Sequence, residues 1–206
     1  TTTLFWGVSG NLKFIVLAWA GLVLGFGTAQ ATSLLGVVAI GTAAGATWAS
    51  FKARLDEAEK VIPLGIALGL LVIVMNAIYW VPQTPLQIWT WQTDLRVAVA
   101  AVFLLILGGV GGYLVVPMNA LLQHRGHNLM GAGRSIAVQN FNEQLCILLL
   151  GALYVGMEWG GLNSITAIII FGVAVVAVML YIARWYARNM RLHTAEMQTL
   201  LALARD

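Results

Sequence analysis

Two ionisable side chains lie inside long apolar segments of this sequence, where charge is costly. Lys13 is about nine residues into the first apolar segment, and Glu143 lies within the fifth. A charged group at the centre of a membrane-spanning helix costs roughly 2.5–3.5 kcal/mol, so it usually faces a cavity or a partner. Lys13 therefore either forms an ion pair that holds two helices together or presents a cation to an anionic group in a cavity. Both interpretations require an acidic partner.

Glu143 belongs to a polar stripe on the fifth segment. Ser135, Gln139 and Glu143 follow each other at intervals of four residues, which places them on one face of a helix. Asn140 borders this stripe, and Asn119 on the preceding segment is a weaker candidate for the same site. Inside lipid such a stripe must face protein or water. It therefore either lines a cavity or forms hydrogen bonds between helices.

The sequence offers no catalytic group and no set of metal ligands. The three histidines, His124, His127 and His193, are expected in loops or in the tail, so none can act as a buried base. HExxH and CxxC spacings are absent, and the single cysteine, Cys146, cannot form an intrachain disulfide. We therefore expect no enzyme, no cofactor and no bound metal.

The composition predicts an all-α membrane protein that positions these polar groups. Of the 206 residues, 60% are hydrophobic and only 9% are charged, whereas soluble domains carry roughly 25% charged residues. A helix needs about 20 mostly apolar residues to cross a bilayer. Six segments meet this requirement: residues 4–26, 32–51, 61–81, 95–122, 131–157 and 162–185. The net charge of +3 is too small to indicate nucleic-acid binding.

The connections between the segments predict the orientation. We expect a short turn at 27–31, a polar linker at 82–94 with Trp89 and Trp91 as interface anchors, and an amphipathic tail at 186–206. Lys and Arg are concentrated in cytoplasmic loops of membrane proteins. Here they gather at 52–60, at 125–134 and after residue 183, and Arg96 is the exception on the other side. Six spans with this pattern place both ends of the chain in the cytoplasm.

Small residues recur at helical spacing in two segments. Gly36, Gly41 and Gly45 are expected to allow close helix packing in lipid. The glycines at 108–112, followed by Pro117, predict a bend in the fourth segment, which would suit a moving or substrate-lining helix.

From about Leu4 to the last segment, nearly the whole membrane part of the chain resembles the bacterial lysophospholipid transporters, a family of the major facilitator superfamily. The residues that carry the resemblance are Leu4-Phe5-Trp6-Gly7, Lys13-Phe14, the run Val115 to Gln123, Arg125-Gly126, Gly131-Ala132-Gly133, and Ala137 to Asn140 with Glu143. Arg134 departs from the family pattern, in which a small polar residue is expected.

The resemblance implies a fold of twelve helices in two halves, of which residues 1–185 are the second. The first residues, Thr1-Thr2-Thr3, form no signal peptide, and we expect the chain to begin partway through a longer protein. The missing N-terminal six-helix half would then be its partner. The family moves lysophospholipids, chiefly lysophosphatidylethanolamine, to the inner leaflet of the bacterial inner membrane, where an acyltransferase restores the missing chain. Lys13 would attract the phosphate, and Gln139 with Glu143 would receive the ammonium or a glycerol hydroxyl.

Two other functions remain open from the residues. The chain could belong to a proton-coupled exporter of drugs or metabolites, with Glu143 as the proton carrier. It could also act alone as a lipid-binding or assembly module.

Overall fold

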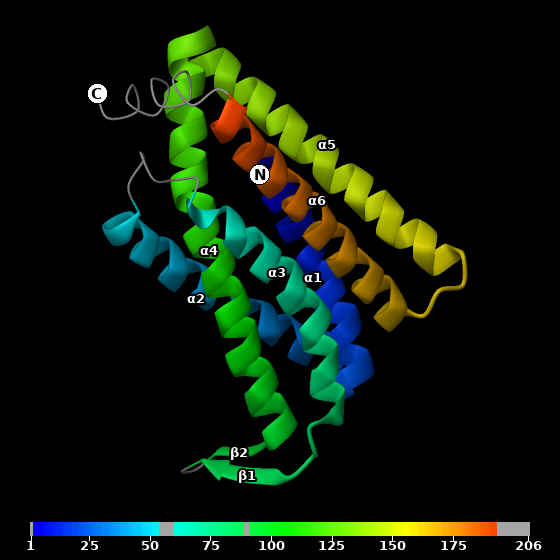
Figure 1. The fold of residues 1–206 in the computed structure, drawn as a ribbon. Helices are drawn as coiled ribbons and strands as arrows, with labels where there is room; N and C mark the ends of the chain where they lie inside the picture. Colours follow the sequence, from blue (N-terminus) through cyan, green and yellow to red (C-terminus); the bar gives the residue numbers. More distant parts are fainter. Residues whose placement is uncertain (1, 54–59, 89–90, 193–206) are drawn as a thin grey trace.

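The computed structural model describes residues 2–53, 60–88 and 91–192, without the side chains of 88, 91, 92, 125 and 127–130. Within these ranges the chain forms six long helices and one β-hairpin (Figure 1). Each long helix is apolar enough to cross a membrane, the third together with the 3-10 turn that follows it. The elements are α1 Thr2–Leu24, α2 Thr28–Lys52, α3 Ile62–Val74 with the 3-10 helix η2 Met75–Trp80, β1 Pro85–Ile88, β2 Trp91–Asp94, α4 Leu95–Met130, α5 Ala132–Trp159 and α6 Ser164–Leu192. The prediction of an all-α membrane protein is confirmed.

The connection between α1 and α2 is shorter than the sequence predicts. Gly25 has a φ of 69°, which lets the chain reverse at once, and α2 already begins at Thr28. Residues 28–31 are helical rather than a turn, and hydrogen bonds within the first turn of the helix satisfy the polar groups there. The Thr32 hydroxyl donates to the Thr28 carbonyl at 2.7 Å, and the Gln30 side chain accepts from the Gly27 backbone N–H at 3.3 Å.

The fourth helix is longer than predicted. The expected loop after residue 122 is helical, and α4 continues to Met130 before Gly131, with a φ of 83°, turns the chain into α5. At 1.5 Å per residue its 36 residues measure about 54 Å, well beyond the roughly 30 Å of a hydrocarbon core. The side chains of Arg125 and His127 lie outside the part of the structure that is described, as do residues 54–59 and the tail 193–206 with His193.

Within the polar linker at 82–94, β1 and β2 form an antiparallel hairpin that the sequence did not predict. Pro85 lies opposite Asp94, and Leu86 lies opposite Thr93. An isolated two-stranded hairpin is marginal in water, so this one depends on its attachment to α4. The Leu95 N–H donates to the Thr84 carbonyl at 2.9 Å. Trp89 lies outside the described residues, and of Trp91 only the backbone is described.

Glycines bring α2 and α4 into backbone contact. Gly41 and Gly45 lie against the backbone of Leu105 and Gly109, while Gly112 lies against the Thr42 carbonyl. The packing prediction is confirmed for these positions, but Gly36 faces open space. The helix runs unbroken through the glycines at 108–112, and Figure 1 shows α4 changing direction in its upper half, which holds Pro117.

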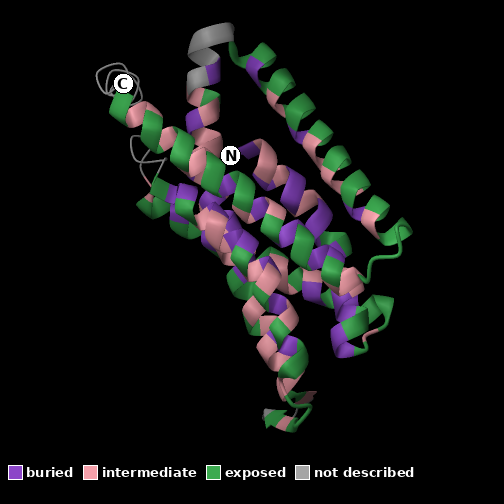
Figure 2. Cartoon of the chain, turned by 45° about the vertical axis from the view of Figure 1, so that its right-hand side comes forward, coloured by how far each residue is buried: buried purple, intermediate pink, exposed green. Residues whose placement is uncertain are grey.

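Two further pairs of helices are in contact, α3 with α6 and α1 with α5. Gly65 and Gly69 of α3 meet Met179 and Val176 of α6, so these two helices run antiparallel. Helices α1 and α5 run parallel, with Gly7 against Cys146. Figure 2 shows buried residues gathered in the middle of the bundle, while α5 is exposed along most of its length.

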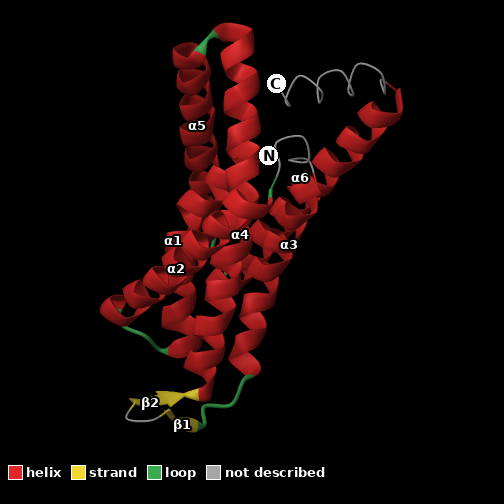
Figure 3. Ribbon diagram, turned by 90° about the vertical axis from the view of Figure 1, so that its left-hand side faces the viewer, coloured by secondary structure: helices red, strands yellow, loops and turns green. Residues whose placement is uncertain are grey.

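The two ends of the bundle differ in charge. One end carries the α4–α5 junction and both ends of the described chain, and the opposite end carries the hairpin (Figures 1 and 3). Exposed basic side chains at the first end are Lys52, Lys60, Arg134, Arg184, Arg188 and Arg191. At the hairpin end Arg96 is held by backbone carbonyls: its Nε donates to Val81 O at 2.7 Å and its Nη1 to Val23 O at 3.2 Å.

Candidate functional site

Three of the predicted site residues meet between α4 and α5. Gln139 Nε2 donates a hydrogen bond to Glu143 Oε1 at 2.8 Å and a longer one to Asn119 Oδ1 at 3.4 Å. Glu143 is only 8% exposed. The cluster combines carboxylate and amide oxygens, which accept hydrogen bonds, with amide N–H groups, which donate them. It can therefore bind an ammonium or a hydroxyl.

The stripe on α5 faces α4 because the two helices approach closely at their junction. Ser135 is buried and packs against Gly126 of α4, where a side chain larger than hydrogen would collide with the Ser135 hydroxyl. Ser135 therefore lies on the predicted stripe but acts in helix packing. The interhelical hydrogen bond from Gln139 to Asn119 agrees with the second interpretation of the stripe.

The depth of the cluster follows from the contact between α1 and α5. Gly7 lies against Cys146 and Leu150, and Asn11 lies against Ile147 and Gly151. Since the helices run parallel, Glu143 is level with the first turn of α1. The cluster thus lies near the end of the apolar span, toward the α4–α5 junction, and not at its centre.

Lys13 lies elsewhere. It is the central residue of α1, and its side chain is exposed. Its Nζ lies 4.9 Å from the ring centroid of the neighbouring Phe14, and no described acidic residue forms an ion pair with it. Along the helix axes Lys13 is about 14 Å from the level of Glu143, at 1.5 Å per residue. The structure therefore does not bring Lys13 and Glu143 together.

Several polar side chains of α5 point away from the bundle. Asn140, a predicted site residue, is exposed, and so are Asn142 and Gln144. None of the three has a hydrogen-bond partner among the described residues. In lipid an unsatisfied polar group is costly, so these positions of α5 do not suit contact with acyl chains.

Sequence reasoning missed a large apolar groove between α2 and α4. It has a volume of about 890 Å³ and is lined chiefly by Ile40, Trp48, Leu105 and Tyr113, with Lys52 at one end. The rings of Trp48 and Tyr113 pack edge to face in this groove, with their centroids 6.1 Å apart. Gly41, Gly45 and Gly109 are among its lining residues, at the place where α2 and α4 are in backbone contact. Their spacing was the available signal, but only the pairing of α2 with α4 shows where the space lies.

The fold and the buried polar groups define a helical membrane protein with six candidate spans among its described residues. The chain is 40% identical to the lysophospholipid transporter LplT of Serratia proteamaculans over 154 residues, which is 74% of this chain and 35% of the relative. Lysophospholipid transporters of Cronobacter sakazakii and of Escherichia coli O1:K1 are 37% and 36% identical over the same shares.

The chain is thus a relative of the bacterial lysophospholipid transporters, and it spans about a third of the length of the curated relatives that it matches. No family model matches the sequence. No solved structure matches it either.

Proposed function

We propose that the chain is the second six-helix half of a major facilitator superfamily transporter that moves lysophospholipids, chiefly lysophosphatidylethanolamine, across the bacterial inner membrane. The similarity to lysophospholipid transporters over three quarters of the chain carries this proposal. The single-chain lipid would be delivered to the cytoplasmic leaflet, where an acyltransferase restores the second chain.

The proposed partner is an N-terminal six-helix half. Four polar side chains support the need for such a partner. They are exposed on membrane-spanning helices and have no hydrogen-bond partner in the described chain: Lys13, Asn140, Asn142 and Gln144. Polar groups at such positions usually face a protein or a water-filled cavity. A second half that packs against α1 and α5 would enclose such groups in a central cavity.

The orientation follows from the basic residues. The end with the α4–α5 junction carries six exposed basic side chains, whereas Arg96 at the other end is bonded to backbone carbonyls. By the positive-inside rule the junction faces the cytoplasm, and both ends of the described chain lie on that side.

The two polar positions would act in sequence. The phosphate and ammonium of an ethanolamine headgroup are separated by only two carbons, so one headgroup cannot occupy Lys13 and Glu143 at once. Lys13 would attract the phosphate at the middle of the membrane. The cluster of Asn119, Gln139 and Glu143 would then receive the ammonium or a glycerol hydroxyl about 14 Å closer to the cytoplasm, as the halves rock about the site.

The acyl chain would remain in an apolar environment during this passage. The groove between α2 and α4, at about 890 Å³, lies within the range of ligand pockets and is mostly apolar. Lys52 at its cytoplasmic end offers a cation beside the emerging headgroup.

The test is transport by the complete protein in proteoliposomes, with labelled lysophosphatidylethanolamine and lysophosphatidylglycerol as substrates. We expect saturable movement of both. Glu143→Gln should lower the ethanolamine-to-glycerol ratio at least about five-fold, since it removes the charge that receives the ammonium. Glu158→Gln is the matched control, because Glu158 lies on the same helix but at its far end, bonded to Tyr154.

An exporter of drugs or metabolites would behave differently. In that case lysophospholipids would not move, a small-molecule cargo would, and its transport would stop with uncouplers and with Glu143→Gln. Either the absence of lysophospholipid movement or an unchanged substrate ratio in Glu143→Gln would contradict the proposed roles.

A further inference from the structure

The last turns of α6 carry a row of arginines that the proposed transport route does not use. Arg184, Arg188 and Arg191 follow each other at four and three residues, so they share one stripe of the helix. All three are exposed, and none forms an ion pair or hydrogen bond with the described chain. Like charges at this spacing destabilise a helix. The row therefore favours an anion that the described residues do not supply.

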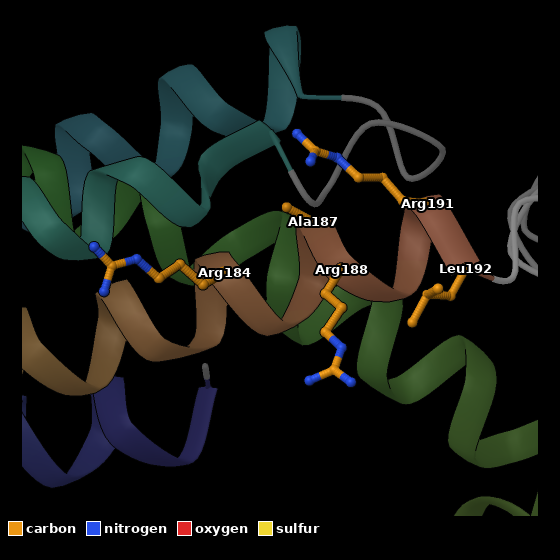
Figure 4. Close-up of a pocket in the computed structure, with 5 residues that line it drawn as sticks. All are labelled: Arg184, Ala187, Arg188, Arg191 and Leu192. Atoms are coloured by element: carbon orange, nitrogen blue, oxygen red, sulfur yellow. The ribbon is translucent and has the colours of Figure 1, made fainter.

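The arginines line a pocket at the surface of the bundle. It has a volume of about 420 Å³ and is completed by Ala187 and Leu192. Figure 4 shows Arg184 and Arg191 extending to one side of α6 and Arg188 to the other. The guanidinium groups are thus spread along about 10 Å of helix. One small ion cannot contact all three guanidinium groups at this spread. A phospholipid headgroup that lies along the helix suits it better.

The length of α6 places this pocket at the membrane surface. Its 29 residues measure about 43 Å, whereas the hydrocarbon core is roughly 30 Å thick. Tyr181, which is 68% exposed, and Trp185, which is 59% exposed, flank the first arginine as aromatic anchors do at headgroup level. Arg188 and Arg191 then lie about one and two turns further out, where lipid phosphates are found.

We propose that the C-terminal end of α6 binds the phosphate of a two-chain anionic phospholipid of the surrounding leaflet. Arginine suits this role because its planar guanidinium can donate two parallel hydrogen bonds to a phosphate. The exposed Leu192 lines the pocket, and the exposed Trp185 follows its first arginine in the helix; such apolar side chains suit the acyl part of a lipid better than a free ion in water. The site is separate from Lys13 and from the cluster around Glu143, so it does not depend on which substrate is transported.

The experiment compares lipid binding to the complete protein in an uncharged detergent. Dioleoylphosphatidylglycerol and dioleoylphosphatidylcholine are titrated, and bound lipids are counted by native mass spectrometry. Each basic residue near an anionic lipid surface strengthens association about five-fold. We therefore expect Arg188→Gln to lower the preference for phosphatidylglycerol about five-fold and the triple variant R184Q/R188Q/R191Q to lower it about a hundred-fold.

Arg134→Gln is the matched control, since Arg134 is an exposed arginine at the same end of the bundle but outside the pocket. It should leave the preference unchanged. An equal loss in Arg134→Gln, or a full preference in the triple variant, would overturn the proposal. Displacement of the lipid by millimolar inorganic phosphate would assign the pocket to a free anion instead.

A second measurement does not require a variant. Raising the salt from about 0.1 M to about 1 M shortens the Debye length from about 10 Å to 3 Å. The wild-type preference for phosphatidylglycerol should fall at least about ten-fold over this range, and a salt-independent preference would contradict the proposal.

Discussion

Asn11 on α1 donates a hydrogen bond from its Nδ2 to the backbone carbonyl of Ile147 on α5, at 3.0 Å. The same nitrogen also lies 2.8 Å from the Gly7 carbonyl of its own helix. Asn11 is 4% exposed. This contact fixes the register of α1 against α5, from which the depths of Lys13 and Glu143 follow.

Asn11→Ala should loosen this pair of helices without touching the polar cluster. Interhelical hydrogen bonds in membranes contribute about 0.6 kcal/mol on average and at most about 1.7 kcal/mol, so we expect a loss of stability in this range. Thermal unfolding in detergent measures it. Thr47→Ala is the control, because the Thr47 hydroxyl bonds only within α2, to Ala43. If the two variants have equal melting temperatures, the register of α1 against α5 does not depend on Asn11.

Gly45→Ala should destabilise the protein, whereas Gly36→Ala should not. A Cβ on Gly45 would collide with the backbone oxygen of Gly109, while nothing lies within 4 Å of one on Gly36. Both substitutions gain up to about 1 kcal/mol of helix propensity, so the second should be neutral or slightly stabilising. Melting temperatures in one detergent decide the comparison. If Gly45→Ala melts with or above Gly36→Ala, then α2 and α4 are not in backbone contact.

Arg96→Ala should release the hairpin end of the bundle. The guanidinium joins the Val23 carbonyl in the last turn of α1 to the Val81 carbonyl just after η2, and it lies 5.7 Å from the Tyr79 ring centroid. Hydrogen bonds from charged groups contribute roughly 1.5–3 kcal/mol, so we expect a loss of this order and faster hydrogen exchange at residues 81–96. Arg96→Lys should recover only part, because an ammonium lacks the fork that reaches both carbonyls. Unchanged exchange in Arg96→Ala would rule out this role.

Lys13→Ala should impair transport more than folding. No described acidic side chain pairs with Lys13, so its removal breaks no ion pair among the described residues. We expect lysophospholipid transport by the complete protein to fall at least about ten-fold, in line with the loss of a charged hydrogen bond, with near-normal melting. Lys13→Arg should retain part of the activity. Parallel losses of expression and transport would instead indicate an ion pair with the other half.

Gln139→Leu should destabilise the wild-type protein more than it destabilises a Glu143→Leu variant. In the wild type it leaves a buried carboxylate without its 2.8 Å donor, and an unsatisfied buried acceptor costs about 1–3 kcal/mol. The double-mutant cycle should give a coupling of about 0.5–3 kcal/mol. Additive effects would mean that the two side chains do not interact.

The sequence by itself determined the six spans, the all-α class and the end of the bundle that gathers the basic residues. These features are local, because apolar runs and the charges that flank them suffice to decide which segments enter lipid. The sequence likewise predicts the stripe of Ser135, Gln139 and Glu143, since helical periodicity determines which residues share a face of a helix.

Only the tertiary structure decided how these pieces meet. Three features join residues on different helices: the pairing of Asn119 with Gln139, the contact of Asn11 with Ile147 and the groove beside Gly45. The periodicity of one helix carries no information on its register against another. That register separates Lys13 from Glu143 by about 14 Å, although both had been assigned to one site. The extension of α4 to Met130 and the hairpin at 85–94 were also missed, because polar residues at a membrane boundary suit a loop, a strand or a protruding helix equally well.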